Sequence, residues 1–389
     1  MAGTKRSPDI WLFAITVALL VIGIFMVFDA SYARAGQGKL TGGDSYYFVK
    51  RQAVFAVIGL FAMFIAQRIP YWWLKRCTAI FLLLGIIGLG LVFVPGIGRS
   101  ANGAARWVGR GVFSFQPSEF AKLALVLYLA HRVSRTKIDI RDFWRGLAPA
   151  LVPIAIIGAL VIAEPDMGTT VITCATGIVL IYIAGARKSH MALIVTGGLI
   201  LGGILIAIEP YRVARLLVFL NPFADYSGSG YQICRSLIAL GSGGPFGVGL
   251  CEGREKIFYL PAEHTDFIVS VLGEEVGLIG MLALSALFLL FAIRGFKIAK
   301  RTGDNFGKFL ATGITCLIAG QALLNMLVAT SSVPATGVPL PFISYGGSSL
   351  ALNLMIVGIL LGISQYPNGG EDEDRPYRRR NRGSRVPGY

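Results

Sequence analysis

The sequence has few charged residues and few of the residues that build metal sites or disulfide frameworks. Only 15% of its 389 residues are charged, 54% are hydrophobic, and the mean hydropathy is +0.67. Five cysteines make no disulfide framework, although Cys234 and Cys251 share one segment and could pair, and no CxxC spacing accompanies the three histidines. This composition excludes an ordinary soluble globular domain and indicates a membrane protein.

Apolar runs long enough to cross a bilayer recur along almost the whole chain. Because lipid cannot satisfy open backbone polar groups, these runs are expected to be α-helices packed in one bundle. Residues 1–364 are therefore predicted to form one all-α polytopic membrane domain, with its first span retained as an anchor. We predict ten transmembrane helices, over 10–28, 52–69, 77–95, 117–133, 147–164, 168–185, 191–208, 267–293, 309–328 and 346–364.

The connections between these spans predict the orientation of the chain. Most Lys and Arg fall on the side of the N-terminus, which places both termini in the cytoplasm. Segment 209–265 is then a long irregular extracytoplasmic loop between spans 7 and 8, and the proline-rich segment 330–349 is irregular too, buried or lining a cavity. The charged tail 365–389 is predicted to be disordered. Its basic half either lies on anionic lipid or is simply solvated.

Asp266 stands where the long outer segment enters the eighth span. An ionisable group at the lipid boundary is a functional-site hypothesis, and partial burial would raise its pKa towards that of a general base. The alternative is an anion that only complements the helix dipole. Glu274 and Glu275 are expected to be paired structurally. A helically spaced stripe runs from Asp266 and is predicted to be open to another chain or a lipid tail: Ser270, Gly273 and Gly277.

The outer side carries more cations than the preference for positive inner loops allows. One cluster surrounds the second outer loop and favours a phosphate-bearing partner; its members are Arg99, Arg106, Arg110 and Lys122. A second cluster lies in the long outer segment, where phosphate contact and plain exposure to water stay equally open; its members are Arg212, Arg215, Arg235, Arg254 and Lys256.

Two further groups of ionisable residues each admit a functional and a structural interpretation. Glu119 and Lys122 share a helix face, and they either set the charge of a cavity mouth or neutralise each other in the bundle. Glu164 and Asp166 flank Pro165 between two spans. This carboxylate pair either positions a substrate or caps the turn.

Seven segments, in family order, resemble the SEDS family (shape, elongation, division and sporulation), the bacterial RodA, FtsW and SpoVE proteins. They are KRQ (50–52), NGAARWVGRGVFSFQPSEFAK (102–122), EPDMGT (164–169), NPFADYSGSGYQ (221–232), SLIALGSGG (236–244), LPAEHTDFIVSVLGEEVG (260–277) and GVPLPFISYGGSS (337–349). The sequences of the fourth and fifth segments are more similar to the division and sporulation branch of the family than to the elongation branch.

The resemblance implies a ten-helix peptidoglycan glycosyltransferase that polymerises lipid II at the outer face of the cytoplasmic membrane. The family's essential aspartate falls on Asp266, its cavity pair on Glu119 and Lys122, and its loop arginine and tryptophan on Arg106 and Trp107. It also implies a class B penicillin-binding protein, a transpeptidase, as partner, alongside other divisome or elongasome membrane proteins. No nucleic-acid partner is expected.

The expected mechanism is an inverting glycosyl transfer. Asp266 takes the proton of the acceptor 4-hydroxyl while the isoprenyl diphosphate leaves, its charge held by Arg106, Lys122 and Arg51. A divalent cation, Mg²⁺ or Mn²⁺, stays open as a further aid, although no DxD ligand set occurs. The rival hypothesis is a lipid II flippase, which predicts paired broken helices near the midplane. Further expected substrate contacts are Trp107, Glu119, Asp166, Arg212, Lys256 and Glu263.

Overall fold

The computed structural model describes residues 6–38, 41–101, 104–109, 114–135 and 139–367. In this part of the chain the elements are α1 (Ile10–Gln37), α2 (Tyr47–Arg68), α3 (Tyr71–Leu91), β1 (Gly98–Ala101), β2 (Ala104–Val108), α4 (Pro117–Val133), α5 (Ala148–Ala163), α6 (Met167–Ile183), α7 (Lys188–Ile208), α8 (Pro210–Leu220), α9 (Tyr231–Gly243), α10 (Ile268–Arg301), α11 (Asn305–Ala329) and α12 (Gly347–Ser364).

The chain is a nearly all-helical, multi-pass membrane protein. Within the described residues, eight helices are long and apolar enough to span a membrane, α5 being counted with the π-helical turn Phe143–Leu147 before it. The helices α4 and α6, of 17 residues each, are not among the eight. All ten lie where the sequence predicted spans, so the positions of the predicted helices are confirmed.

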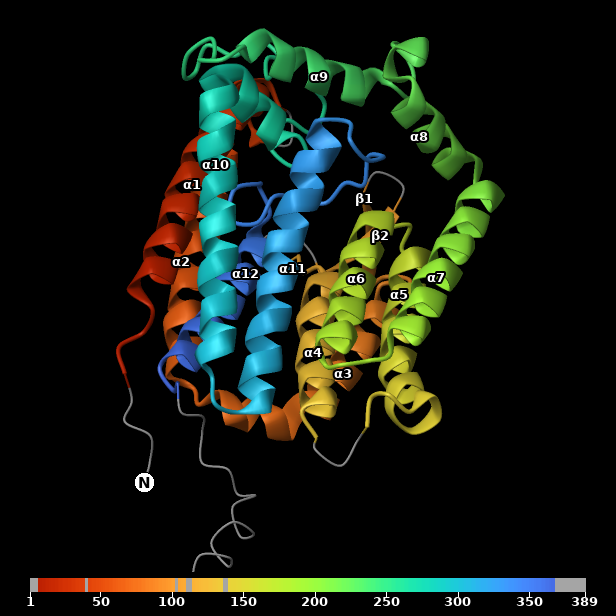
Figure 1. The fold of residues 1–389 in the computed structure, drawn as a ribbon. Coiled ribbons are helices and arrows are strands. Elements are labelled where there is room, and N and C mark those ends of the chain that lie inside the picture. The colour runs from red at the N-terminus through yellow and green to blue at the C-terminus, as the bar shows by residue number, and fades with distance from the viewer. Residues whose placement is uncertain (1–5, 39–40, 102–103, 110–113, 136–138, 368–389) are drawn as a thin grey trace, which may run out of the picture.

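The long helices stand side by side, and the short helices α8 and α9 lie across one end of the bundle (Figure 1). We call this end, with the segment that joins α9 to α10, the α9 end. The described parts of both termini lie at the opposite end, which we call the terminal end. The chain thus has its elaborate connections at one end and both of its termini at the other.

Burial differs sharply among the helices. The most apolar window of α12 is 67% buried and that of α11 is 61% buried, whereas the corresponding window of α7 is only 6% buried. Close approach supports this central packing: a Cβ at Gly358 of α12 would lie 2.3 Å from the carbonyl oxygen of Met63 on α2. Only glycine fits there, as at other close helix contacts in membranes. α7 stands at the edge of the bundle with its apolar surface uncovered (Figure 1).

Two connections contain more regular structure than the sequence predicted. β1 and β2 form an antiparallel hairpin in the connection between α3 and α4, so the fold is not purely α-helical. The long segment before α10 is not simply irregular, because it folds into α8 and α9. In α9, Ile233 and Ala239 are buried while Gly241 is exposed. The prediction of an irregular loop followed from the length and polarity of this segment and missed its helical periodicity.

The predicted open stripe below Asp266 is wrong, because α9 covers it. The hydroxyl of Ser270 lies 2.6 Å from that of Ser236 on α9. A Cβ at Gly273 would meet the side chain of Leu240 at 2.4 Å. Gly277, with φ of 65°, then breaks the helix, so that the first turns of α10 are a short separate piece. This piece joins the long part of α10 at the α9 end.

Candidate active site

Asp266 lies in the loop immediately before α10, and side chains from α11 and from the segment before α12 fix this loop. The side-chain amide of Asn325 donates to the carbonyl oxygens of Asp266, at 2.9 Å, and Val338, at 2.7 Å. The hydroxyl of Ser344 donates to the carbonyl oxygen of Thr265 at 2.6 Å. The segment before α12 is irregular, as predicted, and its polar groups serve to hold the loop that carries Asp266.

Arg106 on β2 joins the hairpin to the turn between α5 and α6. Its guanidinium donates to the carbonyl oxygens of Glu164, at 3.3 Å, and Pro165, at 2.5 Å. The same guanidinium lies 3.6 Å from the buried carboxylate of Asp166. Asp166 also caps α6 by accepting from the backbone N–H of Thr169 at 3.0 Å. Asp166 therefore caps α6 and is also paired with Arg106, whereas its predicted contact with the substrate stays a prediction.

Burial raises the pKa of Asp266 to about 6, and the surrounding charges modify this effect in both directions. The cations of Arg106 and Arg215 lower the pKa of Asp266, whereas the Asp166 carboxylate raises it. A carboxyl group with a pKa near 6 is ionised at neutral pH yet is a better proton acceptor than an exposed aspartate. Asp266 thus has the acid–base property that a general base needs.

Glu164 is a second unusual carboxyl group beside this site. Its side chain is fully buried, and neither of its oxygens has a hydrogen-bond partner within the described part of the chain. Burial, followed by the charge of Asp166, raises the pKa of Glu164 to about 8, against the opposing effect of Arg106. Glu164 is therefore mostly protonated at neutral pH, and Asp266 faces fewer negative charges than the sequence suggests.

A cavity of about 470 Å³ adjoins the Asp266 loop. Thr265, the neighbour of Asp266 in sequence, forms part of its wall. Two arginines, three large aromatic residues, Ser114 and three small residues at the start of α12 form the rest; the arginines, aromatics and small residues are Arg51, Arg99, Phe55, Trp107, Tyr345, Gly346, Gly347 and Ser348. Such a mixture of guanidinium groups and aromatic rings suits a ligand with phosphate and sugar parts.

Glu119 and Lys122 form a buried ion pair in the bundle. The ammonium of Lys122 donates to Glu119 at 2.8 Å and to the side-chain carbonyl of Gln321 on α11 at 2.8 Å. Gln321 in turn donates to the carbonyl oxygen of Pro339 at 2.9 Å. The pair thus links α4 and α11 to the irregular segment before α12. The prediction that it contacts the substrate stays a prediction.

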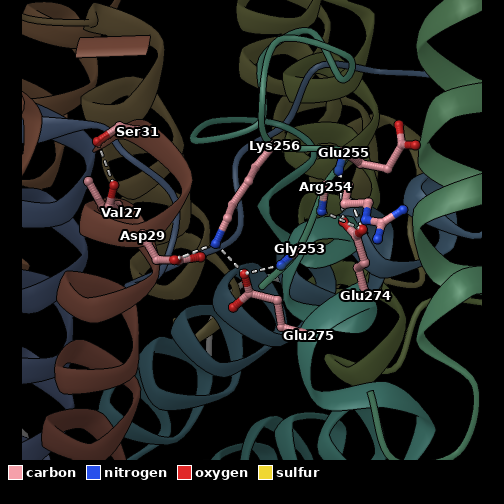
Figure 2. Close-up of polar contacts among 9 residues, drawn as sticks. All are labelled: Val27, Asp29, Ser31, Gly253, Arg254, Glu255, Lys256, Glu274 and Glu275. Atoms are coloured by element: carbon pink, nitrogen blue, oxygen red, sulfur yellow. Dashed lines mark hydrogen bonds and ion pairs between the residues drawn. The ribbon is translucent and has the colours of Figure 1, made fainter. Parts of the chain in front are cut away.

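Lys256 lies in a closed cluster instead of facing a cavity, which disagrees with its predicted contact to the substrate. Its ammonium donates to Asp29 on α1 and to Glu275 on α10, and all three side chains are buried (Figure 2). The carboxylate of Glu274 accepts from the backbone N–H groups of Arg254 and Glu255. The predicted structural pairing is confirmed for Glu275, whereas Glu274 is bound by backbone N–H groups instead of a cation.

Two other predicted substrate contacts are also engaged elsewhere. The buried carboxylate of Glu263 lies 2.6 Å from the guanidinium of Arg34, so it holds the loop against α1. Arg212 donates to the carbonyl oxygen of Leu205 at the joint between α7 and α8. Cys234 and Cys251 are not bonded to each other. Arg110 and the tail beyond residue 367 lie outside the described residues.

The structure adds residues to the site that the sequence interpretation did not single out. Asn325 holds the Asp266 loop, and Tyr345 and Ser348 form part of the cavity wall. A signal for Asn325 was present, because an amide within an apolar span needs a partner. The other two lie in a recognised motif, but nothing in their residue types separated them from packing residues.

Fold and site together define a multi-pass membrane protein with an acid–base group beside an arginine-lined cavity at one end of its bundle. The family model for the FtsW, RodA and SpoVE proteins, described as cell cycle protein, matches residues 10–369. The chain belongs to this family.

Relatives and solved structures agree with this assignment. The chain is 44% identical to stage V sporulation protein E of Bacillus subtilis strain 168, over 94% of this chain and 99% of that protein. It is 42% identical to a probable peptidoglycan glycosyltransferase FtsW of Geobacter metallireducens, over 93% and 96%.

Two solved structures have the same fold. A chain from a peptidoglycan synthase complex that coordinates polymerization and crosslinking has a TM-score of 0.76 and 26% identity, covering 92% of this chain and 97% of that chain. RodA of Thermus thermophilus has a TM-score of 0.67 and 25% identity, over 92% and 96%. The names of these relatives favour synthesis over the flippase alternative.

Proposed function

We propose that this chain is a peptidoglycan glycosyltransferase that polymerises lipid II at the outer face of the cytoplasmic membrane. The observation that carries the proposal is Asp266, a carboxyl group with a pKa of about 6 beside an arginine-lined cavity. The names of the FtsW relatives supply the reaction class. A septal or sporulation role fits the two groups of relatives equally well.

In this mechanism Asp266 acts as the general base. Its carboxylate accepts the proton of the acceptor sugar's 4-hydroxyl, and the hydroxyl oxygen forms a bond to the donor's anomeric carbon. The bond from that carbon to the diphosphate oxygen breaks, so the isoprenyl diphosphate leaves with the electron pair. One displacement inverts the anomeric centre and gives a β-linked chain from an α-linked donor. Asn325 acts by holding the loop that carries Asp266, and the positive charge of Arg106 favours the ionised carboxylate.

The diphosphate binds in the cavity beside Asp266. Arg51 and Arg99 supply guanidinium groups there, and Trp107 and Tyr345 supply flat surfaces for the sugar or the first isoprene units. Within the described residues, no three carboxylate, cysteine or histidine side chains converge as ligands for an ion, so a divalent cation would be held mainly by the diphosphate itself. The guanidinium groups of the cavity therefore carry the charge of the leaving diphosphate in this proposal.

We propose that the membrane domain has ten spans, with α4 and α6 added to the eight longer helices. Arg106 lies shortly before α4 and donates to carbonyl oxygens of the turn after α5. The start of α4 and the end of α5 are therefore at the same end of the bundle, as expected if each of the two helices crosses the membrane once. Most of α4 is buried against α3, α6 and α11, which explains how it tolerates the Glu119–Lys122 pair. The bias of Lys and Arg places both termini in the cytoplasm and the α9 end outside.

A class B penicillin-binding protein is the proposed partner. The support is the similarity to a chain from a complex that coordinates polymerization with crosslinking, because crosslinking requires a transpeptidase. The exposed apolar surface of α7 and the helices of the α9 end are free for such contacts within the described chain.

A one-sided assay tests the function. The full chain and its partner are reconstituted in liposomes, lipid II is supplied only at the α9 end of the protein, and glycan polymer is measured. Polymer is the expected result, whereas a transporter would move lipid II across the membrane and form none. Movement without polymer would therefore overturn the proposal.

A further inference from the structure

A second cavity, of about 260 Å³, lies at the terminal end of the bundle, away from Asp266. Three parts of the chain meet there: the segment before α1, the end of α10 and the end of α12. The backbone N–H of Arg6 donates to the carbonyl oxygen of Gln365 at 3.0 Å, and that of Asp9 donates to the hydroxyl of Ser364 at 3.1 Å. The cavity is therefore built by defined contacts between distant parts of the chain.

The cavity carries positive charge that the described protein does not neutralise. Asp9 caps α1 and accepts two hydrogen bonds from the guanidinium of Arg294, so the charges of Asp9 and Arg294 balance each other. Arg6, Lys297 and Arg301 line the same cavity. Within the described part of the chain, none of these three forms an ion pair. Three unpaired cations around one cavity call for an anion.

Complementing the dipole at the end of α10 does not explain this arrangement by itself. Lys300 is also in the last turn of α10 and would serve the dipole equally well, yet it does not line the cavity. Arg294, Lys297 and Arg301 follow each other at helical spacing on the face that does. The fourth cation, Arg6, comes from a different segment. The cations therefore converge on a common space.

The surroundings of the cavity indicate that its anion comes from the bilayer. Ile10 and Trp11 form part of the wall and are 72% and 64% exposed. On α10, beside the cavity residues Arg294 and Lys297 in the sequence, Ile293 is 50% and Phe296 is 44% exposed. Both helices are membrane-spanning candidates, and tryptophan is enriched where such helices meet the headgroups. An anion bound here sits at headgroup depth with uncovered apolar surface beside it.

We propose that this cavity binds the phosphate group of an anionic membrane phospholipid. The guanidinium of Arg301 and the ammonium of Lys297 donate to the phosphate oxygens, and Arg6 closes the site from the N-terminal segment. The acyl chains lie along the exposed apolar side of α1 and α10. The site is separate from the glycan chemistry, so its test is independent of the proposed function.

Lipid retention measures the proposal directly. The full chain is purified in mild detergent, and the bound phosphatidylglycerol is counted by native mass spectrometry. Lys297→Gln with Arg301→Gln should lower retention roughly 10- to 30-fold, because both cations line the cavity and each strengthens the binding of the lipid phosphate by a similar factor. The matched control, Lys188→Gln with Lys300→Gln, removes two exposed cations elsewhere at helix ends and should retain the normal amount.

Two competition experiments test whether the site requires an anionic lipid. One asks whether a lipid without net charge binds as well, and the other asks whether an anion without acyl chains does. Phosphatidylcholine and inorganic phosphate at about 10 mM should each fail to replace phosphatidylglycerol, because one lacks net charge and the other lacks acyl chains. Equal loss in the double variant and its control would overturn the proposal, as would full replacement by inorganic phosphate. If the double variant does not fold, Arg6→Gln, outside any helix, should still lower retention roughly fivefold.

Discussion

The α9 end of the bundle holds two groups of charged side chains. They differ in whether their charges are enclosed by one another or lie beside a cavity. In the Lys256 cluster, the ammonium is enclosed between Asp29 and Glu275, and all three groups are buried (Figure 2). Near Asp266, the guanidinium of Arg106 donates to a backbone carbonyl oxygen and is paired with Asp166. An arginine-lined cavity adjoins the loop that carries Asp266. In the first group the buried charges are paired with one another, whereas the second group adjoins a cavity.

The comparison teaches that residue type alone does not separate a structural role from a chemical one. Both groups combine Lys or Arg with carboxylates near the same helix, and the sequence predicted contact with substrate for members of both. Lys256 and Glu274 tie the segment before Asp266 to α1 and α10, so the closed group supports the open one. Variants that act on one group only can test this division.

Replacing Asp266 should have the largest effect. Asp266→Asn removes the proton acceptor but keeps the size of the side chain, so polymer formation should fall about 10³-fold without loss of folded protein. Radiolabelled lipid II and gel analysis measure the product, and thermal unfolding measures folding. Asp44→Asn, which removes a carboxylate paired with Lys50 in the connection between α1 and α2, is the control and should keep normal activity. Normal polymer from Asp266→Asn would refute its role as base.

Breaking the closed cluster should act on stability. Lys256→Met leaves two buried carboxylates without their cation, which should cost about 3–5 kcal/mol of unfolding free energy. Thermal unfolding in detergent measures the loss. Adding Asp29→Asn and Glu275→Gln should restore part of it, because the stranded charges are removed. A Lys256→Met protein that melts normally yet makes no polymer would instead return Lys256 to the substrate site.

Arg106→Gln tests the electrostatic setting of Asp266. The guanidinium lowers the pKa of Asp266, which burial raises to about 6. Without it that pKa rises, so the acidic limb of the pH–activity profile should move up by about one unit, and activity near pH 6 should fall about fivefold. Arg106→Lys keeps the charge and should move the limb less. An unchanged limb with reduced activity would mean that Arg106 acts only by positioning.

Much of the fold was predictable because hydropathy marks the parts of helices that lie within the bilayer, whether protein or lipid covers them. All ten helices were located, but α1 runs on to Gln37 and α10 to Arg301, since helices continue past the apolar zone until a breaker. The hairpin and the helices of the α9 end escaped prediction, because their register depends on contacts with the bundle. Asp166 and Ser270 show the same limit: their partners lie on other elements.

The site was predictable to the extent that the chemistry of single residues is visible in a sequence. Asp266 was identified because a carboxyl group at a lipid boundary is costly, and Arg106 because of the motif that contains it. Lys256 and Glu263 were assigned to the substrate because a sequence does not show that their charges are already enclosed by Asp29 and Arg34. Burial of charge is a property of the assembled bundle.

Glu164→Gln should have the smallest effect on activity. It tests whether a buried carboxyl group beside Asp266 takes part in the reaction. Because the pKa of Glu164 is raised to about 8, the native side chain is mostly neutral at pH 7, and a neutral amide should keep polymer formation within about threefold. The raised pKa also means that the native protein loses stability as pH rises from about 4.5 to about 8, by up to about 1.4 kcal/mol per pH unit. The glutamine variant cannot ionise and should unfold at a midpoint that depends less on pH over this range. A variant that loses activity like Asp266→Asn would show that the charged form of Glu164, despite its burial, belongs to the catalytic group.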